Sequence, residues 1–222
     1  NKKWDTYNQA KLLNEFKEKG ISTEEIAKKI GLRKSEVEKQ IRGYLASQNF
    51  IEETNKENYG GKFNAYDKLM IFIELTNNEV LRKWVGWNSE KQVFENKKNI
   101  DRFYDWILPL IGNDDVTGEE LIEEPIITNH KQVRLLPEII NDEDTIQYME
   151  EIRNFELALN SNRDFSKKKF SNVLIEVEKI LGNIPYHAGL DIDAEDLKRL
   201  DSIKRIAENI RKSNISTSND EN

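Results

Sequence analysis

The residues of this chain with the clearest chemistry are basic, amide and hydroxyl side chains near its N-terminus. Lysine, arginine and glutamine donate hydrogen bonds to phosphates or base edges, and serine or glutamate can accept from a base. We expect one set to contact DNA phosphates: Lys28, Lys29, Arg33 and Arg42. We expect a second set to face base edges: Lys34, Ser35, Glu36, Lys39 and Gln40. The predicted partner of this surface is double-stranded DNA.

Two short helices joined by a tight turn must position these side chains, and the sequence predicts them between Ile21 and Ile41. Ala27 is small where the helices would touch, and Gly31 accepts the positive φ of a turn without steric cost. Apolar residues flank both at the offsets that a common core needs: Ile26, Ile30, Leu32, Val37 and Ile41. This spacing predicts a helix-turn-helix, whose second helix lies in the major groove.

The ends of these helices also carry signals. We expect a first helix over 6–19, and a second that begins at a capping box formed by Ser22 and Glu25. The third should run from Lys34 to near Asn55, with a weak N-cap because Arg33 stands where serine or threonine is common. Three-helix bundles of this kind also serve as dimer contacts or plain scaffolds, so the geometry alone leaves DNA binding open.

Helical periodicity continues through the rest of the chain, and no stretch combines strand alternation with hairpin turns. We therefore predict an all-α fold with a helix-turn-helix unit over 1–58, a helical C-terminal domain over 62–212 and a disordered tail over 213–222. Gly60 and Gly61 are the expected boundary. Further helices are expected over 63–75, 79–87, 96–107, 130–140, 144–159, 166–181 and 194–212.

Charge is distributed unevenly along the chain. The net charge is −7, yet residues 1–50 hold eleven Lys and Arg against seven Asp and Glu, a net of +4. The other 172 residues must therefore sum to −11, which places any phosphate-facing surface at the N-terminal end. Glu36 and Glu38 count against pure phosphate binding, although glutamate can accept from a cytosine amine.

Composition excludes several classes of protein. The absence of cysteine excludes disulfides, thiolate zinc sites and thiol catalysis. No apolar run is long enough to cross a bilayer or to act as a signal peptide, so we expect a soluble, cytoplasmic protein with no membrane partner. Because the chain starts at Asn1 without a methionine, we expect it to be part of something longer.

Other chemically active residues give weaker patterns. His187 lies near Asp191, Asp193 and Asp196, but capping of the last helix by Asp193 explains the acids better than a metal site. Arg134 would pair with an acidic segment or a phosphate, and Thr128 or Asn129 would cap the helix that His130 opens. The acidic pairs 114–115 and 123–124 lie in a solvated stretch, which does not favour general acid–base catalysis. We expect no catalytic residue, metal or cofactor.

Two further segments have simple structural interpretations. Residues 113–125 contain six acidic side chains and no basic one, which predicts an exposed, mobile connector. An aromatic group follows helical spacing: Trp84, Trp87, Phe103, Tyr104 and Trp106. We expect these aromatics to form a hydrophobic core, while a groove for a protein partner remains the alternative.

At this point the sequence resembles a known group. The segment from Ile21 to Ile41 looks like the helix-turn-helix of ParB/Spo0J-type partition proteins, and residues 81–87, 99–107 and 128–140 look like the helical region of ParB-like proteins with an extended C-terminus. In that family a ParB/sulfiredoxin-like domain precedes the helix-turn-helix, and in some members it binds or hydrolyses nucleotide or cleaves nucleic acid. Its arginine-rich motif is not found here, so the resemblance would put such activity upstream of Asn1.

These observations favour a DNA-binding protein of ParB-like type. The helix-turn-helix would enter the major groove, and the acidic helical part would serve self-association or recruitment of a protein partner. A homodimer is expected because one recognition helix reads few base pairs. The alternative is a protein–protein interaction module in which the helix-turn-helix is only a scaffold.

Overall fold

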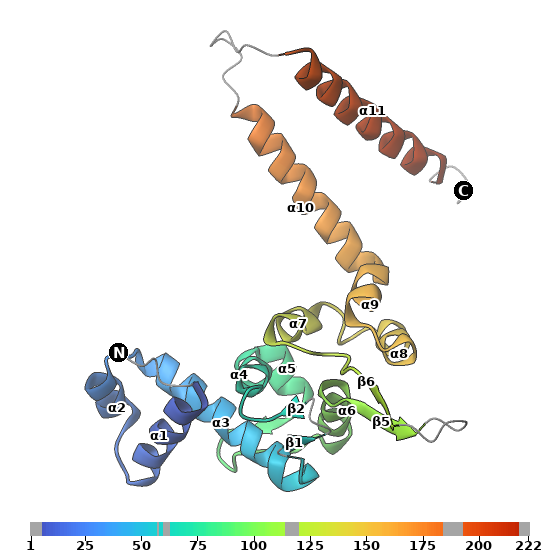
Figure 1. Cartoon of the computed structure of the whole chain (residues 1–222). Helices are drawn as coiled ribbons and strands as arrows, with labels where there is room; N and C mark the ends of the chain where they lie inside the picture. The colour runs from blue at the N-terminus through green and yellow to red at the C-terminus, as the bar shows by residue number, and fades with distance from the viewer. Residues whose placement is uncertain (1–5, 57, 60–62, 114–119, 184–192, 218–222) are drawn as a thin grey trace. The chain divides into compact units, whose positions relative to one another are not determined.

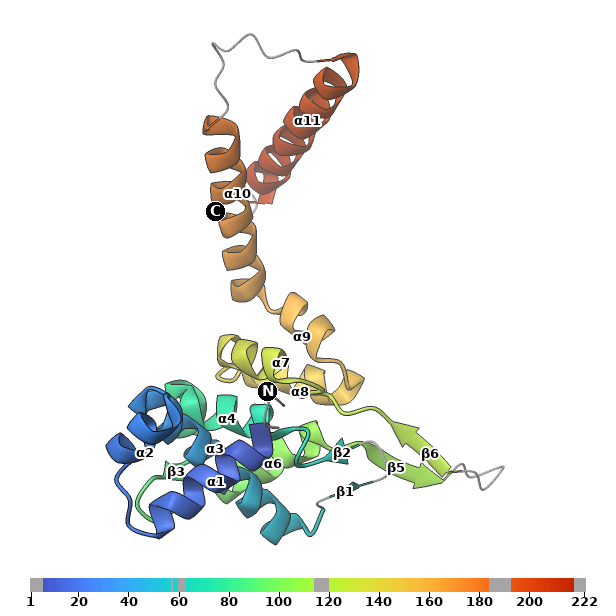
Figure 2. The same cartoon turned by 60° about the vertical axis from the view of Figure 1, so that its left-hand side comes forward.

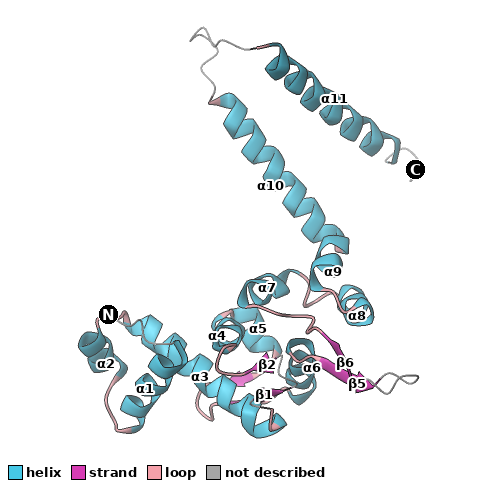
Figure 3. Ribbon diagram, viewed as in Figure 1, coloured by secondary structure: helices cyan, strands magenta, loops and turns pink. Residues whose placement is uncertain are grey.

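Helices make up most of the chain, as the computed structural model shows (Figure 3). The structure describes residues 6–56, 58–59, 63–113, 120–183 and 193–217. Within these ranges it contains eleven α-helices, one short 3-10 helix and three two-stranded antiparallel sheets. The all-α prediction is confirmed, with the correction that three short strand pairs interrupt the helices.

The chain divides into two compact units, residues 1–170 and 171–222. Figure 1 labels the helices of both units. This division differs from the predicted one near Gly60, and the helix Lys34–Thr54 contributes both to the helix-turn-helix cluster and to the main core. Gly60 and Gly61 themselves lie outside the described residues. The expected tail is also corrected in part, because the last helix extends to Thr217, while 218–222 fall outside the described range.

The first three helices match the prediction closely. They are α1 (Thr6–Glu18), α2 (Thr23–Ile30) and α3 (Lys34–Thr54). Ser22 caps α2 as expected: its hydroxyl accepts from the Glu25 amide at 3.3 Å, and the Glu25 carboxylate accepts from the Ser22 amide at 3.1 Å. Gly31 ends α2 with φ 75°, the left-handed conformation that glycine adopts freely. Figure 2 shows α1 lying across α3.

Helix α4 (Leu69–Asn77) packs along α3 at very short range. Gly43 of α3 faces Ile73, and a Cβ added at Gly43 would lie 2.8 Å from the Cα of Ile73. Only glycine permits this approach, because real Cβ atoms do not come so close to a backbone. The predicted helix over 63–75 is corrected at its start, since Phe63 belongs to a strand and α4 begins at Leu69.

The main core lies beyond α3 and contains the predicted aromatic residues. It is built by α5 (Glu79–Trp84), α6 (Lys97–Ile107), α7 (His130–Leu135), the 3-10 helix η1 (Leu136–Glu138), α8 (Glu143–Ile152) and α9 (Phe155–Ser161) together with α3 and α4. Trp106 and Phe103 are almost fully buried, and the Trp84 ring stacks on Trp106 with centroids 5.5 Å apart. The interpretation of this group as core is confirmed.

Short hairpins connect these helices. The strand pairs are β1 (Asn58–Tyr59) with β2 (Phe63–Asn64), β3 (Trp87–Asn88) with β4 (Val93–Phe94), and β5 (Leu110–Asn113) with β6 (Glu120–Glu123). The last pair corrects the expectation of a mobile acidic connector, since backbone pairing from Leu110–Glu123 to Asn113–Glu120 holds both of its ends. Residues 114–119 lie outside the described part.

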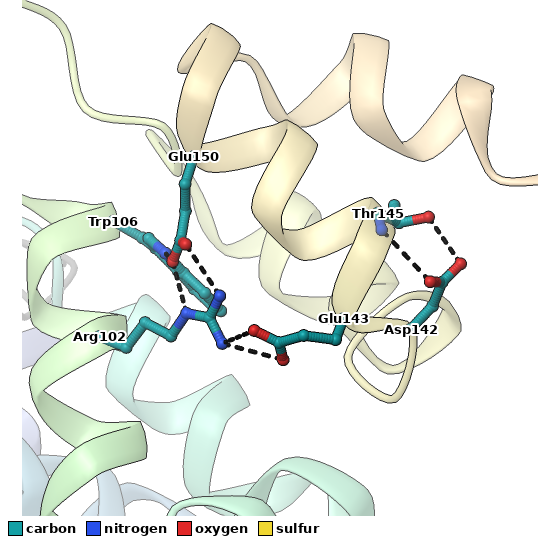
Figure 4. Close-up of polar contacts among 6 residues, drawn as sticks. All are labelled: Arg102, Trp106, Asp142, Glu143, Thr145 and Glu150. Carbon is teal, nitrogen blue, oxygen red and sulfur yellow. Dashed lines mark hydrogen bonds and ion pairs between the residues drawn. The ribbon is translucent and has the colours of Figure 1, made fainter.

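Polar contacts fix α8 against α6 (Figure 4). The Arg102 guanidinium binds Glu150 through Nη2 at 2.8 Å and Glu143 through Nη1, and the Trp106 indole donates to Glu150 at 2.7 Å. Burial raises the pKa of Glu150, but the hydrogen bonds from Arg102 and Trp106 outweigh it, so the pKa is lowered. The predicted helix over 144–159 is two helices, because Arg153 adopts φ 49° and Asn154 caps α9.

The remaining helices are α10 (Arg163–Gly182) and α11 (Ala194–Thr217). Large apolar side chains on both are 38–63% exposed: Val173, Leu174, Ile175, Val177, Ile180, Leu197, Leu200, Ile203 and Ile206. Among the described residues, no helix is long and apolar enough to cross a membrane.

We predict that Gly43→Ala destabilises residues 1–170. The added methyl group would force α3 from α4, and overpacking costs about 1–3 kcal/mol. That cost exceeds the gain of up to about 1 kcal/mol in helix propensity. Urea unfolding followed by tryptophan fluorescence measures the difference. Gly112→Ala is the control, since a Cβ there meets nothing within 4 Å. Equal midpoints for the two variants would contradict the close approach.

Candidate nucleic-acid interface

The helix-turn-helix rests on a compact apolar cluster. Its fully buried members are Leu13, Ile26, Ala27, Val37 and Ile41, and the half-buried residues packed on them include Phe16, Ile21, Ile30, Leu32 and Leu45. All five predicted apolar positions thus face one core, and Ala27 lies at the contact of α2 with α3. The geometry inferred from the spacing is confirmed.

Five of the nine predicted contact residues lie on the outer surface of this unit. They occupy the end of α2, the turn and the first turn of α3, and each is exposed: Lys28, Lys29, Arg33, Lys34 and Ser35. Glu36 follows them and is half-buried. The amide of Arg33 donates to the Glu36 carboxylate at 3.1 Å, so Glu36 supplies the cap that the Arg33 side chain lacks.

Carboxylates neutralise part of the positive charge on this surface. Lys34 forms an ion pair with Glu24 and lies 3.9 Å from Glu38, and Arg33 binds Glu36 at 3.0 Å. A hydrogen bond from Lys34 lowers the pKa of Glu24, and one from Arg33 lowers that of Glu36. Both carboxylates are therefore ionised near neutral pH. A phosphate that approaches Lys34 must displace an acidic partner.

The other three predicted residues are less available, because α4 and neighbouring segments cover α3 after its first turn. Lys39 lies 4.0 Å from the buried Glu74 and its side chain is 32% exposed. The side-chain oxygen of Gln40 and the Nε of Arg42 are buried, and neither has a hydrogen-bond partner among the described residues. This packing leaves Lys39 partly exposed and buries the Gln40 oxygen, and the expectation that both face base edges stays a prediction.

Two residues that the sequence reasoning missed organise this region. Glu74 is 5% exposed and accepts from Arg134 at 2.6 Å, so Arg134 is paired with a helix rather than with the acidic connector or a phosphate. A sequence signal existed, since Glu74 is the only charged residue of α4. Glu24 had no such signal, because ten residues separate it from Lys34 and only the turn brings them together.

The remaining candidate sites have structural roles. Asn129 caps α7 by accepting from the amides of Lys131 and Gln132, as expected. Asp193 accepts from the amides of Glu195 and Asp196 at 2.8 Å each and caps α11, also as expected. His187, Asp191 and the pair 114–115 lie outside the described residues, and within the described ones no group of three metal-binding side chains occurs.

Comparisons of the chain with models of protein families, with curated proteins and with solved structures found no match. A function must therefore be inferred from the arrangement of the residues themselves. That arrangement combines a packed helix-turn-helix, exposed cations at the start of α3 and acidic groups interleaved with them.

We predict that Ser22→Ala weakens the helix-turn-helix, because the Glu25 amide loses its cap. Loss of a serine N-cap costs about 1 kcal/mol. Urea unfolding monitors the change, with Ser35→Ala as the matched control, since Ser35 is exposed in the first turn of α3 and no cap depends on it. A Ser22→Ala midpoint equal to that of Ser35→Ala would contradict the capping role.

Proposed function

We propose that this chain binds double-stranded DNA through its helix-turn-helix, with the first turn of α3 in the major groove. One observation carries the proposal: the start of α3 projects from a fully packed core and is exposed together with the cations of α2 and the turn. A helix N-terminus adds a positive electrostatic end that favours phosphates. The apolar cluster keeps this surface rigid, which groove recognition requires.

The contact residues divide by their positions. Lys28, Lys29 and Arg33 lie where phosphate contacts would fix the register of the protein on the duplex. Lys34, Ser35 and Glu36 occupy the first turn of α3, where side chains reach base edges. We leave Lys39 and Gln40 out of this surface because Lys39 lies beside the buried Glu74 and the side-chain oxygen of Gln40 is buried.

The acidic partners of this surface support selective rather than indiscriminate binding. Glu24 and Glu38 lie beside Lys34 and repel phosphates. Favourable contacts to DNA must therefore outweigh this repulsion. Such negative charges lower affinity for wrong sites as well as for the right one, and the difference between sites is what defines specificity. We infer that binding is weak at random sequence and strongly dependent on salt.

The likeness of Ile21–Ile41 to the helix-turn-helix of ParB/Spo0J-type proteins supports the same proposal. On that basis we place the protein in the cytoplasm, associated with a nucleoid or plasmid. We infer that any nuclease or nucleotide-hydrolysing activity would reside in a domain preceding this chain.

We further propose that the second unit joins two copies of the chain. Four exposed apolar residues share one side of α10: Val173, Leu174, Val177 and Ile180. In a seven-residue repeat with Val177 at position a, Val173 and Ile180 take position d and Leu174 takes position e, the pattern of a helix that packs on another. Antiparallel pairing with a second α10 would place Lys167 and Lys169 of one copy near Glu176 and Glu178 of the other. This charge complementarity favours a second copy as the occupant of the apolar side.

We predict that the double substitution Lys28→Glu and Lys34→Glu reduces affinity for duplex DNA at least about tenfold, since each charge-assisted contact contributes about 1.5–3 kcal/mol. The slope of log affinity against log salt should fall by about one for each phosphate that the variant no longer binds. Fluorescence anisotropy measures both. The control is Lys98→Glu with Lys131→Glu, two exposed lysines at the starts of other helices.

The substitution Glu24→Gln sharpens this test because it frees Lys34 and removes a negative charge, so DNA affinity should rise. Equal affinities for all variants would refute the groove assignment. An absence of binding by the unaltered chain at low salt would favour the alternative, a protein-interaction module that uses the helix-turn-helix as a scaffold.

We predict that Val177→Lys converts a dimer to a monomer, because a lysine in the seam leaves a charge without water or a partner. Sedimentation equilibrium of the full chain measures the mass. Ile175→Lys is the matched control, since Ile175 is 63% exposed and lies on the opposite side of α10. A monomeric unaltered chain, or equal loss of mass in both variants, would contradict the proposal.

A further inference from the structure

A pocket of about 290 Å³ lies between α3 and the β3–β4 hairpin. The end of α1 and the start of α2 contribute Lys17 and Thr23 to its wall, and α3 contributes Glu38 and Arg42. A hydrogen bond from Asn49 Nδ2 to the carbonyl of Gln92, 3.1 Å long, ties the hairpin to α3. The wall is therefore built from fixed elements of the first unit.

Arg42 lines this pocket without an ion pair, although the charge of Glu38 in the same wall attracts it. It is half-buried, its Nε is buried without an acceptor, and within the described chain no ion pair or hydrogen bond joins it to another residue. Other half-buried arginines differ: Arg102 binds two carboxylates and Arg153 lies 2.9 Å from Glu123. Burial and the positive charge of Arg82 lower the pKa of Arg42, and the negative charge of Glu38 only partly opposes them. A buried charge is normally paired in a folded protein. The half-buried Arg42 guanidinium has no such ion pair, so a bound anion could supply one.

A second donor in the same wall also lacks an acceptor. Trp87 is 8% exposed, and its indole Nε1 is buried with no hydrogen-bond partner among the described residues. The Trp87 ring packs on Phe94 with centroids 4.8 Å apart, which fixes its position. Ser89 and Thr23 add hydroxyl groups, and Lys17 adds an ammonium group. Glu38 is the one acidic side chain of this wall, and Lys34 lies 3.9 Å from its carboxylate.

We propose that this pocket binds a phosphate-type oxyanion, with the Arg42 guanidinium as its main charge partner and the Trp87 ring beside it. A pocket with several donors and two cations against one carboxylate is matched by a ligand that only accepts hydrogen bonds and carries negative charge. Arginine suits this role because its planar group can present two parallel donors to an oxyanion. The volume is near the lower end for small-molecule sites.

The oxyanion has two possible sources with the same chemistry, a backbone phosphate of DNA or a free phosphate. Ser35, Glu38 and Arg42 follow one another at intervals of three and four residues, so they share a side of α3. The pocket therefore lies on the side of α3 that leads to the proposed DNA surface. The inference itself does not depend on DNA binding, because a free phosphate would satisfy the same donors.

Proton–nitrogen NMR of the full chain tests the proposal, since Arg42 Nε–H and Trp87 Nε1–H each give a side-chain signal. Inorganic phosphate, pyrophosphate and duplex DNA are titrated separately. We expect both signals to shift together and to saturate with at least one of these probes. Arg42→Gln should weaken that binding at least about tenfold, as loss of a charge-assisted hydrogen bond implies. Arg163→Gln, at an exposed arginine of α10, should leave it unchanged.

The two sources give different results. If DNA supplies the phosphate, Arg42→Gln lowers DNA affinity and the salt slope, and free phosphate competes only weakly. If the ligand is a free phosphate, the small anions shift both signals and DNA affinity is unaffected by Arg42→Gln. The proposal is overturned if no probe shifts either signal, or if Arg42→Gln binds as the unaltered chain does. Arg42→Lys serves where the glutamine variant fails to fold, and it should also weaken binding because lysine lacks the planar pair of donors that a guanidinium offers an oxyanion.

Discussion

The contact of Gly43 with Ile73 is the constraint on which much of the first unit depends. Because Gly43 has no side chain, Ile73 of α4 can approach the backbone of α3 closely, and α4 covers one side of α3. One side of α3 therefore completes the helix-turn-helix cluster and the other enters the main core through Ala46 and Phe50. A third cluster, in which Tyr7 and Ala10 of α1 meet Leu69 and Ile73 of α4, connects the same elements again.

This packing also decides which charged residues can meet a ligand. A lysine in the first turn of α3 is exposed, whereas Lys39, little more than one turn later, is beside the buried Glu74. Glu74 in turn holds Arg134 of α7. The buried carboxylate thus pairs with two cations, Lys39 and Arg134. The exposed positive surface is therefore confined to the end of α2, the turn and the first turn of α3.

The local parts of the structure could be predicted from the sequence, and the long-range parts could not. The Ser22 capping box, the left-handed Gly31 and the apolar spacing of Ile26, Val37 and Ile41 depend on contacts within a few residues. The break at Arg153 and the β5–β6 pairing were missed, because the first is a non-glycine residue in a rare conformation and the second is a short hairpin rich in acidic residues. The partners of Lys34, Lys39 and Arg134 were missed for another reason. Their carboxylates lie 10, 35 and 60 residues away, and no local pattern encodes such pairs.

The double role of α3 has a consequence for modularity. A helix-turn-helix is often a unit that can be moved from one protein to another, but here cutting the chain after α3 would expose Ala46, Phe50 and the bare backbone at Gly43 to water. It would also remove the α4 residues against which Tyr7 and Ala10 pack. The N-terminal helices therefore form one packed unit with the helices that follow them. Substitutions on α4, far from any predicted contact residue, can change the orientation of α3. They can thereby alter the contacts that the first turn of α3 makes with a ligand.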